Sequence, residues 1–365
     1  MRIIIFASAI IFIYELLSLI LPLRLGLLWK IAAAVILAFG AFKDAIFQLI
    51  GGGMFFAPVL PHWVMLLGSI IYNLFIVVLP LLLCKDIIWL AAKSLHKNFN
   101  ASTASVIVLS LSCAIAAYGT WEALRVPDIA EYDVTIPNLG PEFEGKRIAV
   151  LVDLHASSLN RRPLIRSIVD ETNAAAPDLI LLPGDFVDGT LKQREQDLKP
   201  LKLLRAPLGI FGTAGNHDYY SGYNDWMAKL SEFGITMLEN KHAVIRIGSS
   251  KLVIAGVTDE RGNPDIAAAL AGAPNVPIIL MAHRPLAARK YAKHGISLQL
   301  SGHTHGGMVP LLKNVVAKAN AGFVRGWYNV GKMKLFNSPG TSLWSGFPMR
   351  LFDPAEITLL TLHCH

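Results

Sequence analysis

Four long apolar runs occupy the first third of this 365-residue chain, and they constrain its fold more than any other feature. A transmembrane helix needs about 20 predominantly apolar residues. Runs of this length, or close to it, cover residues 3–21, 31–50, 63–83 and 104–123. We therefore predict a four-helix transmembrane region within residues 1–125.

The charged residues are unevenly distributed along the chain. Residues 1–125 contain 8 basic residues (Lys and Arg) and 4 acidic residues (Asp and Glu). The remaining 240 residues contain 25 basic and 22 acidic residues. The front part therefore has the composition of a membrane-embedded region, and the rear part has that of a soluble domain. The formal net charge is +7, but the soluble part carries only about +3 of it and no basic run. We expect the lipid bilayer as a partner and no nucleic acid, and we leave the oligomeric state open.

Lysine and arginine residues near the apolar runs predict the orientation in the membrane, because short cytoplasmic loops are enriched in them. The loop after the first run contains Arg24 and Lys30, and the predicted loop after the third contains Lys85, Lys93 and Lys97. With both loops in the cytoplasm, the rear domain lies on the outer side of the membrane.

Residues 126–145 include three prolines and are predicted to form a linker, followed by a domain over residues 146–362. In this domain short apolar segments alternate with helical ones, such as residues 163–175, which is typical of an α/β sheet with parallel strands. The predicted strands cover residues 147–152, 179–182, 209–213, 251–257, 277–282 and 297–300.

Polar residues follow the ends of nearly all these strands, at the edge where open α/β folds bind their ligands. The candidate metal ligands and their neighbours are Asp153, His155, Asp185, Asn216, His217, His283, His303 and His305. Carboxylate, imidazole and amide donors without a thiolate suit Mn, Fe or Zn and exclude an iron–sulfur cluster. Eight such groups exceed the needs of one ion but match two ions that share a carboxylate, a centre suited to displacement at phosphorus. Glycines, which permit a tight turn, directly precede three of these positions, at Gly184, Gly215 and Gly302.

Five sequence blocks occur in order: Asp153-Leu154-His155, Gly184-Asp185-Phe186-Val187-Asp188, Gly215-Asn216-His217-Asp218, a lone His283, and Gly302-His303-Thr304-His305. Together they resemble the signature of the calcineurin-like metallophosphoesterases, D-x-H, G-D-x-x-D, G-N-H-[DE], H and G-H-x-H. The resemblance implies an α/β domain in which a β-sandwich is flanked by helices. Membrane helices before such a domain resemble the bacterial membrane-anchored enzymes of the YkuE-like type.

The resemblance also implies the site residues and two divalent metal ions, Mn, Fe or Zn. One ion would be held by Asp153, His155 and His305, and the other by Asn216, His283 and His303, with Asp185 as the bridging ligand. His217 would act as the general acid or stabilise charge on the phosphoryl group, and Asp218 would orient its ring. Asp188 would hold a ligand histidine or a metal-bound water. Met308 departs from the glutamine of many relatives, at a position expected to line the substrate mouth.

The resemblance implies a hydrolase that cleaves a phosphoester or pyrophosphate, of a small molecule or a lipid, with a metal-bridging hydroxide. It also implies a multi-pass protein of the bacterial inner membrane, and the positions of the lysine and arginine residues predict a periplasmic or extracellular domain. Two other functions stay open. One is a hydrolase similar to the UDP-2,3-diacylglucosamine hydrolases of lipid A synthesis, which would need a cytoplasmic domain. The other is a non-catalytic sensor or scaffold. The stretch 309–330 is either an amphipathic cover near a membrane surface or a loop over the sheet edge.

Overall fold

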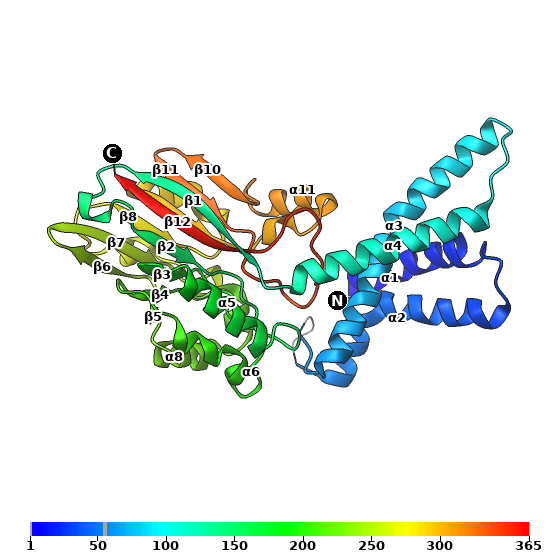
Figure 1. The fold of residues 1–365 in the computed structure, drawn as a ribbon, viewed down its shortest axis with the longest axis horizontal. Coiled ribbons are helices and arrows are strands. Elements are labelled where there is room, and N and C mark those ends of the chain that lie inside the picture. Colours follow the sequence, from blue (N-terminus) through cyan, green and yellow to red (C-terminus); the bar gives the residue numbers. More distant parts are fainter. Residues whose placement is uncertain (1, 54–56, 365) are drawn as a thin grey trace. The chain divides into compact units, whose positions relative to one another are not determined.

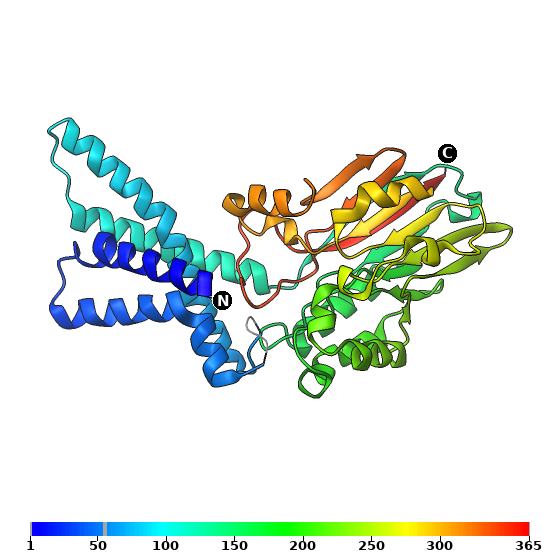
Figure 2. The same cartoon turned by 180° about the vertical axis from the view of Figure 1, so that it is seen from behind.

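The computed structural model describes residues 2–53 and 57–364, and the chain forms two compact units (Figures 1 and 2). The helical unit contains residues 1–122 and residues 346–349, and the sheet unit contains residues 123–345 and 350–365. The division falls close to the position at which the charge content of the sequence changes.

The helical unit consists of α1 (Arg2–Glu15), the π-helical turn η1 (Leu16–Ile20), α2 (Leu27–Gly51), α3 (His62–Ser94) and α4 (Ala101–Leu124). Among the described residues, α2, α3 and α4 are long and apolar enough to cross a membrane. The first of the four predicted spans corresponds to a shorter apolar helix, Ile4–Ile20.

Helix α3 is longer than the sequence predicts, because it continues past the predicted end of the span to Ser94. Lys85 and Lys93, which we expected in a loop, are therefore helical, and that loop assignment was wrong. The Nζ atom of Lys85 donates to the carbonyl oxygen of Ser18 (2.6 Å) and lies 3.0 Å from a carboxylate oxygen of Asp86. These partners allow a buried lysine to lie inside the helix bundle.

The described residues of the sheet unit form two six-stranded sheets. The order of the first is β1 (Asp128–Ile136), β12 (Glu356–Cys364), β2 (Arg147–Val150), β3 (Leu179–Leu182), β4 (Ile210–Gly212) and β5 (Thr236–Met237). The order of the second is β10 (Gly326–Val330), β11 (Met333–Asn337), β9 (Leu298–Ser301), β8 (Ile278–Met281), β7 (Ser250–Gly256) and β6 (Lys241–Ile247). Strands β2, β3 and β4 are parallel to one another, as are β7, β8 and β9. The mixed α/β sheets predicted from the sequence are confirmed.

Apolar side chains are buried on both faces of the central strands, which explains their continuous apolar sequences. On β2, Ile148 and Val150 belong to an apolar core that also contains Ile254 of β7 and Leu300 of β9. The alternate residue Ala149 belongs to a second core, formed with the helices. Because side chains alternate along a strand, β2 contributes to both cores at once.

Helices follow the strands in the sheet unit and contribute to the outer cores. Their bounds are α5 (Arg162–Ala174), α6 (Leu191–Leu198), α7 (Asn216–Tyr220), α8 (Tyr223–Glu232), α9 (Ile266–Leu270), α10 (Ala288–Tyr291) and α11 (Pro310–Ala319). Helices α5 and α8 pack with strands of the first sheet, and α9 and α10 pack with strands of the second.

The segment predicted as a linker, residues 126–145, is part of the sheet unit. It contains β1, which pairs in parallel with β12 over nine residues. Only Val134 and Ile136 are buried in this strand, and its other side chains are exposed or partly exposed. A half-exposed edge strand therefore has the polar composition that we interpreted as a linker, and residues 125–127 alone separate it from α4.

Candidate metal centre

The polar blocks of the sequence follow β2, β3 and β4, which are parallel in the first sheet, and β8 and β9, which are parallel in the second. In each sheet the carboxyl ends of these strands lie at one edge, and the two edges meet, because His283 Nε2, after β8, lies 3.0 Å from Asp185 Oδ2, after β3. The residues that meet are Asp153, His155, Asp185, Asp188, His217, His283, His303 and His305, several of them in mutual contact.

Five of these residues have a left-handed backbone, which is costly for residues other than glycine. Their φ angles are 58° for Asp153, 42° for His155, 55° for Asp185, 70° for His303 and 49° for His305. Each such conformation costs on the order of 1–3 kcal/mol and persists only where the surrounding structure imposes it. Their concentration after the carboxyl ends of these strands indicates a site in which side-chain direction matters more than local stability.

Glycines make room for these side chains in two ways. Gly184 has a φ of +94°, which favours glycine at the turn before Asp185. At Gly302 the reason is close approach, because a Cβ atom there would lie 2.6 Å from a carboxylate oxygen of Asp153. The same carboxylate accepts hydrogen bonds from the backbone N–H of His303 (3.0 and 3.2 Å).

The carboxylate and imidazole donor atoms form two groups, which together contain the predicted ligands other than Asn216. Asp153, His155 and His305 form the first group, and Asp185, His283 and His303 form the second, with the atoms of each group within 4.8 Å of one another. Asp185 lies between the groups, because its Oδ2 is 3.6 Å from His155 Nε2 and 3.0 Å from His283 Nε2. This is the position that a bridging ligand requires.

A third possible group, His155, Asp185 and His217, includes the residue that we expected to be the acid rather than a ligand. The Nδ1 of His217, however, lies 2.5 Å from Asp188 Oδ1, so this nitrogen is already engaged. The backbone N–H of His217 donates to Asp185 Oδ1 (2.8 Å), which holds the start of α7 against the proposed bridging ligand.

Several buried donor atoms of the centre make no hydrogen bond, which tests whether cations fit here. Among them are His155 Nε2, His305 Nδ1 and Asn216 Oδ1. Leaving a buried polar atom unpaired costs about 1–3 kcal/mol, and each of these atoms has a lone pair that suits a divalent ion. The residues present therefore fit the two metal ions that the sequence predicts.

The tautomer of His283 also suits metal binding. Its Nδ1 lies 2.8 Å from the carbonyl oxygen of Pro183 and acts as a donor to it. The other nitrogen, Nε2, then faces Asp185 and is the atom available to a metal. Burial lowers the pKa of His283, but the carboxylates of Asp185 and Asp153 raise it to about 9, so a proton competes with a metal at this ring.

Burial and neighbouring charges set the charge states of His303, His305, Asp153 and Asp185. It lowers the pKa of His303 to about 3, with a further contribution from His283, and it lowers the pKa of His305 well below its usual range. Both rings are therefore neutral and able to act as ligands. Burial raises the pKa of Asp153, whereas the histidines around Asp185 outweigh burial and hold its pKa well below the usual range.

His217 is oriented by Asp188 and not by Asp218, so the pairing predicted from the sequence was wrong. The Asp218 carboxylate accepts hydrogen bonds from the backbone N–H groups of Asp185, Phe186 and Gly215 (2.8–3.0 Å). Residue Asp218 lies in the first turn of α7, so its side chain turns back toward the start of that helix.

Asp188 joins the ring of His217 to that of a predicted ligand. Its second oxygen lies 3.2 Å from His155 Nδ1. Burial lowers the pKa of His217, but the carboxylates of Asp188 and Asp185 outweigh this effect and raise it to about 9. His217 is therefore positioned as a proton donor. The centroid of its ring lies 5.4 Å from that of Tyr220 and 6.2 Å from that of Trp344.

Arg350 and Trp344 were not identified from the sequence. Arg350 is fully buried, and its guanidinium donates to four backbone carbonyl oxygens, including that of His305 (3.1 Å). It therefore holds the segment that carries a predicted ligand. A single arginine outside any motif has no local signal that would identify it.

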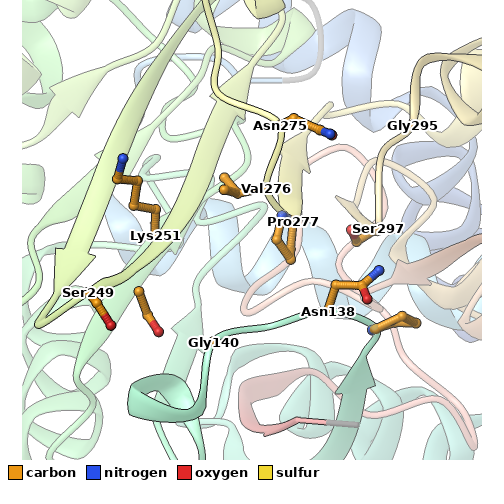
Figure 3. A pocket seen from close by; sticks show the side chains of 11 residues that line it. Asn138, Gly140, Ser249, Lys251, Asn275, Val276, Pro277, Gly295 and Ser297 are labelled. Atoms are coloured by element: carbon orange, nitrogen blue, oxygen red, sulfur yellow. The ribbon is translucent and has the colours of Figure 1, made fainter.

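A hollow of about 580 Å³ lies elsewhere in the sheet unit (Figure 3). It is lined by Lys251 at the beginning of β7, by Pro277 before β8 and by Ser297 before β9. Because the predicted metal ligands follow the ends of β8 and β9, this hollow lies at the opposite edge of the sheet and is not part of the centre.

Comparison with known proteins agrees with this geometry. A family model described as calcineurin-like phosphoesterase matches residues 146–307. The chain is 30% identical over 327 residues to a transmembrane protein with metallophosphoesterase domain from Danio rerio, covering 83% of this chain and 74% of that protein. A protein of the same description from Bos taurus is 32% identical, and the match covers 74% of this chain and 65% of that protein. The uncharacterized metallophosphoesterase YkuE from Bacillus subtilis is 30% identical, covering 60% and 80%.

Proposed function

Because this chain belongs to the calcineurin-like phosphoesterase family, it is a phosphoesterase hydrolase, and we propose that it uses two divalent metal ions to cleave a lipid-linked phosphoester or pyrophosphate at a membrane. The observation that carries the proposal is the position of Asp185 between two groups of buried donors. When bound, two divalent ions supply positive charge that neutralises phosphoryl oxygens and acidifies water.

The residues of the chain supply orientation and a proton. Asp188 holds the ring of His217 through Nδ1, which leaves Nε2 to donate a proton to the leaving oxygen of the substrate. The carboxylate of Asp218 accepts hydrogen bonds from the backbone N–H groups of Asp185 and Gly215 and thus helps to fix the position of the proposed bridging carboxylate. The side chain of Trp344 lies near His217 and is suited to contact the leaving group.

Two features of the helical unit support a lipid-linked substrate. One span is enough to tether a domain, whereas three helices of span length are present among the described residues. These helices and η1 also enclose a hollow of about 200 Å³ that is lined only by apolar residues, among them Leu37 of α2 and Phe75 of α3. Such a hollow is suited to an acyl or isoprenoid chain.

The metal mechanism is tested on the full chain purified in detergent and loaded with Mn, Fe or Zn. Elemental analysis should approach two ions per chain, and the protein should hydrolyse a nitrophenyl phosphodiester. The Asp185→Asn variant should lose the activity and much of the metal. A matched control is Asp170→Asn, which alters an exposed carboxylate that pairs with Arg166. Full activity of Asp185→Asn, or one ion per active chain, would contradict the two-metal mechanism.

The lipid link is tested with two phosphoesters that differ only in the length of the leaving alcohol. We expect a higher kcat/KM for the long-chain ester in mixed micelles. An Ala33→Leu variant narrows the apolar hollow and should reduce hydrolysis of the long-chain ester alone. Ala91→Leu, at an exposed position of α3, is the control. Equal kcat/KM values for the two esters would contradict the lipid link without affecting the metal mechanism.

A further inference from the structure

The most exposed apolar side chains of the sheet unit lie close together. Among its described residues, Phe352 is 83% exposed, Leu311 73% and Val315 63%, whereas no other large apolar side chain exceeds 42%. We refer to these three residues as the apolar patch. Exposed apolar groups that gather at one place mark a binding surface more often than isolated ones do.

The three residues of the patch come from neighbouring segments, because the segment around Phe352 runs beside the start of α11. The backbone N–H of Leu351 donates to the carbonyl oxygen of Met308 (3.0 Å), and Asp353 Oδ2 lies 3.9 Å from Lys313 Nζ. Phe352 lies between these two contacts and is therefore beside the N-terminal part of α11, the helix that carries Leu311. Its backbone is left-handed, with a φ of 68°, which is costly for phenylalanine and brings it no burial within the unit.

Helix α11 has the character of a helix at a membrane surface. None of its described residues is buried in the sheet unit. Leu311 and Val315 are four residues apart and thus lie on one face, and Lys318, three residues after Val315, extends that exposed face with a positive charge. Apolar residues flanked by lysines are typical of helices that bind anionic lipid surfaces. The stretch 309–330 thus contains the helix α11 and the strand β10.

Chain length keeps the patch within reach of a bilayer. Phe352 follows Met349 by three residues, so the two are at most about 11 Å apart. Residues 346–349 belong to the helical unit. Within that unit the side-chain amide of Asn73 donates to the carbonyl oxygen of Pro348 (2.8 Å) and to Thr120 Oγ1, four residues before the end of α4.

We propose that the apolar patch inserts into the interfacial layer of the membrane, with Lys318 against anionic headgroups. The partner is therefore a lipid surface, and the contact adds to the anchoring by the helices. The metal-centre residue His305 begins the short helical turn that directly precedes α11. If the proposed function is right, this contact holds the metal centre close to phosphate groups at the bilayer surface.

The insertion is tested by labelling the full chain in lipid nanodiscs. Cys84, Cys113 and Cys364 are replaced by serine, and a fluorophore is attached to Leu311→Cys or Phe352→Cys. We expect several-fold stronger quenching by lipids with a nitroxide in the upper acyl chain than for a label at Ser249→Cys, an exposed position at the opposite sheet edge. Anionic lipid should increase the difference. Quenching equal to that of the Ser249 label would overturn the proposal. Labels that are shielded without lipid quenching would also overturn it and indicate a second copy of the chain.

A triple variant, Leu311→Ser, Val315→Ser and Phe352→Ser, separates this inference from the proposed function. All three side chains are exposed, so the fold and the metal content should be unchanged. We expect a higher KM for a substrate embedded in vesicles and an unchanged kcat for a soluble nitrophenyl ester. Leu203→Ser, at an exposed position elsewhere in the unit, is the control. An unchanged KM for the vesicle substrate would contradict the docking role. If the protein without these substitutions hydrolyses neither the vesicle substrate nor the soluble ester, the proposed function is contradicted. The quenching experiment would still decide whether the patch inserts into the membrane.

Discussion

Replacing Asp188 by asparagine tests the assignment of His217 most directly. The variant keeps the size of the side chain and removes the charge that lies 2.5 Å from His217 Nδ1. The pKa of His217 is raised from 6.5 to about 9 in the metal-free protein, against the opposing effect of burial, and Asp188 is the first of the carboxylates that raise it. A shift of this size corresponds to about 3 kcal/mol, since one pKa unit is 1.36 kcal/mol.

We expect the pKa of His217 in the metal-free Asp188→Asn variant to fall by at least about one unit, a tenfold change in the protonation equilibrium. Nuclear magnetic resonance of histidine ring carbons in the metal-free chain measures it. With metal present in excess, kcat should fall by about 10²–10⁴-fold for substrates with alkyl leaving groups, the usual contribution of a positioned general acid. Metal affinity should fall by about 10–100-fold, because Asp188 also contacts His155, a predicted ligand.

The matched comparison is Asp218→Asn, the residue that the sequence predicted in this role. Its carboxylate contacts backbone N–H groups, so the pKa of His217 should change less in this variant than in Asp188→Asn. The opposite order, with the larger fall in Asp218→Asn, would refute the reasoning and restore the pairing expected from the sequence.

The remaining predictions concern stability, the acid, metal uptake and orientation. Asp218→Asn should lower the free energy of unfolding by about 1–3 kcal/mol, because an amide cannot accept all three backbone hydrogen bonds; an unchanged denaturation midpoint would contradict this. His217→Ala should keep its metal and lose about 10²–10⁴-fold in kcat, less for nitrophenol leaving groups, whereas His303→Ala should lose metal; equal losses on all leaving groups would exclude the acid role of His217. Because the pKa of His283 is about 9, metal binding must displace a proton, so the apparent metal affinity should rise as the pH rises from 6 toward 9, about tenfold per unit for one proton; titration calorimetry without proton release would contradict this. The cysteine of a Ser249→Cys variant should react with a membrane-impermeant maleimide in intact cells if the sheet unit faces outward. Reaction only after lysis would place the sheet unit in the cytoplasm.

The positions of the metal-centre residues could be predicted from the sequence, because each lies in a short block after an apolar strand. The strands at 179–182 and 297–300, for example, are within one residue of β3 and β9. Edge strands were missed for the opposite reason. In β1 only Val134 and Ile136 are buried, so the segment is too polar to be recognised as a strand without its partner β12.

Partners of charged side chains were the least predictable feature. Lys85 is a charged residue of the kind expected in a loop between spans. It lies within α3 instead, where Asp86 and the carbonyl oxygen of Ser18 contact its ammonium group. Arg350 shows the same dependence, since its four carbonyl partners come from chain segments that meet only in the folded protein.

The residue types in the five blocks settle which donor chemistry the chain can offer, and the length of its apolar runs settles that helices can cross a membrane. Both properties are local, because they depend on side-chain chemistry and on residues that are neighbours in the sequence. Which carboxylate faces His217 is not local: Asp188 and Asp218 stand in similar motifs, and only the start of α7 and the approach of the loop after β3 direct one to the ring and the other to the backbone. Side-chain direction depends on the phase of a helix and the packing of distant segments, so the tertiary structure alone decides it.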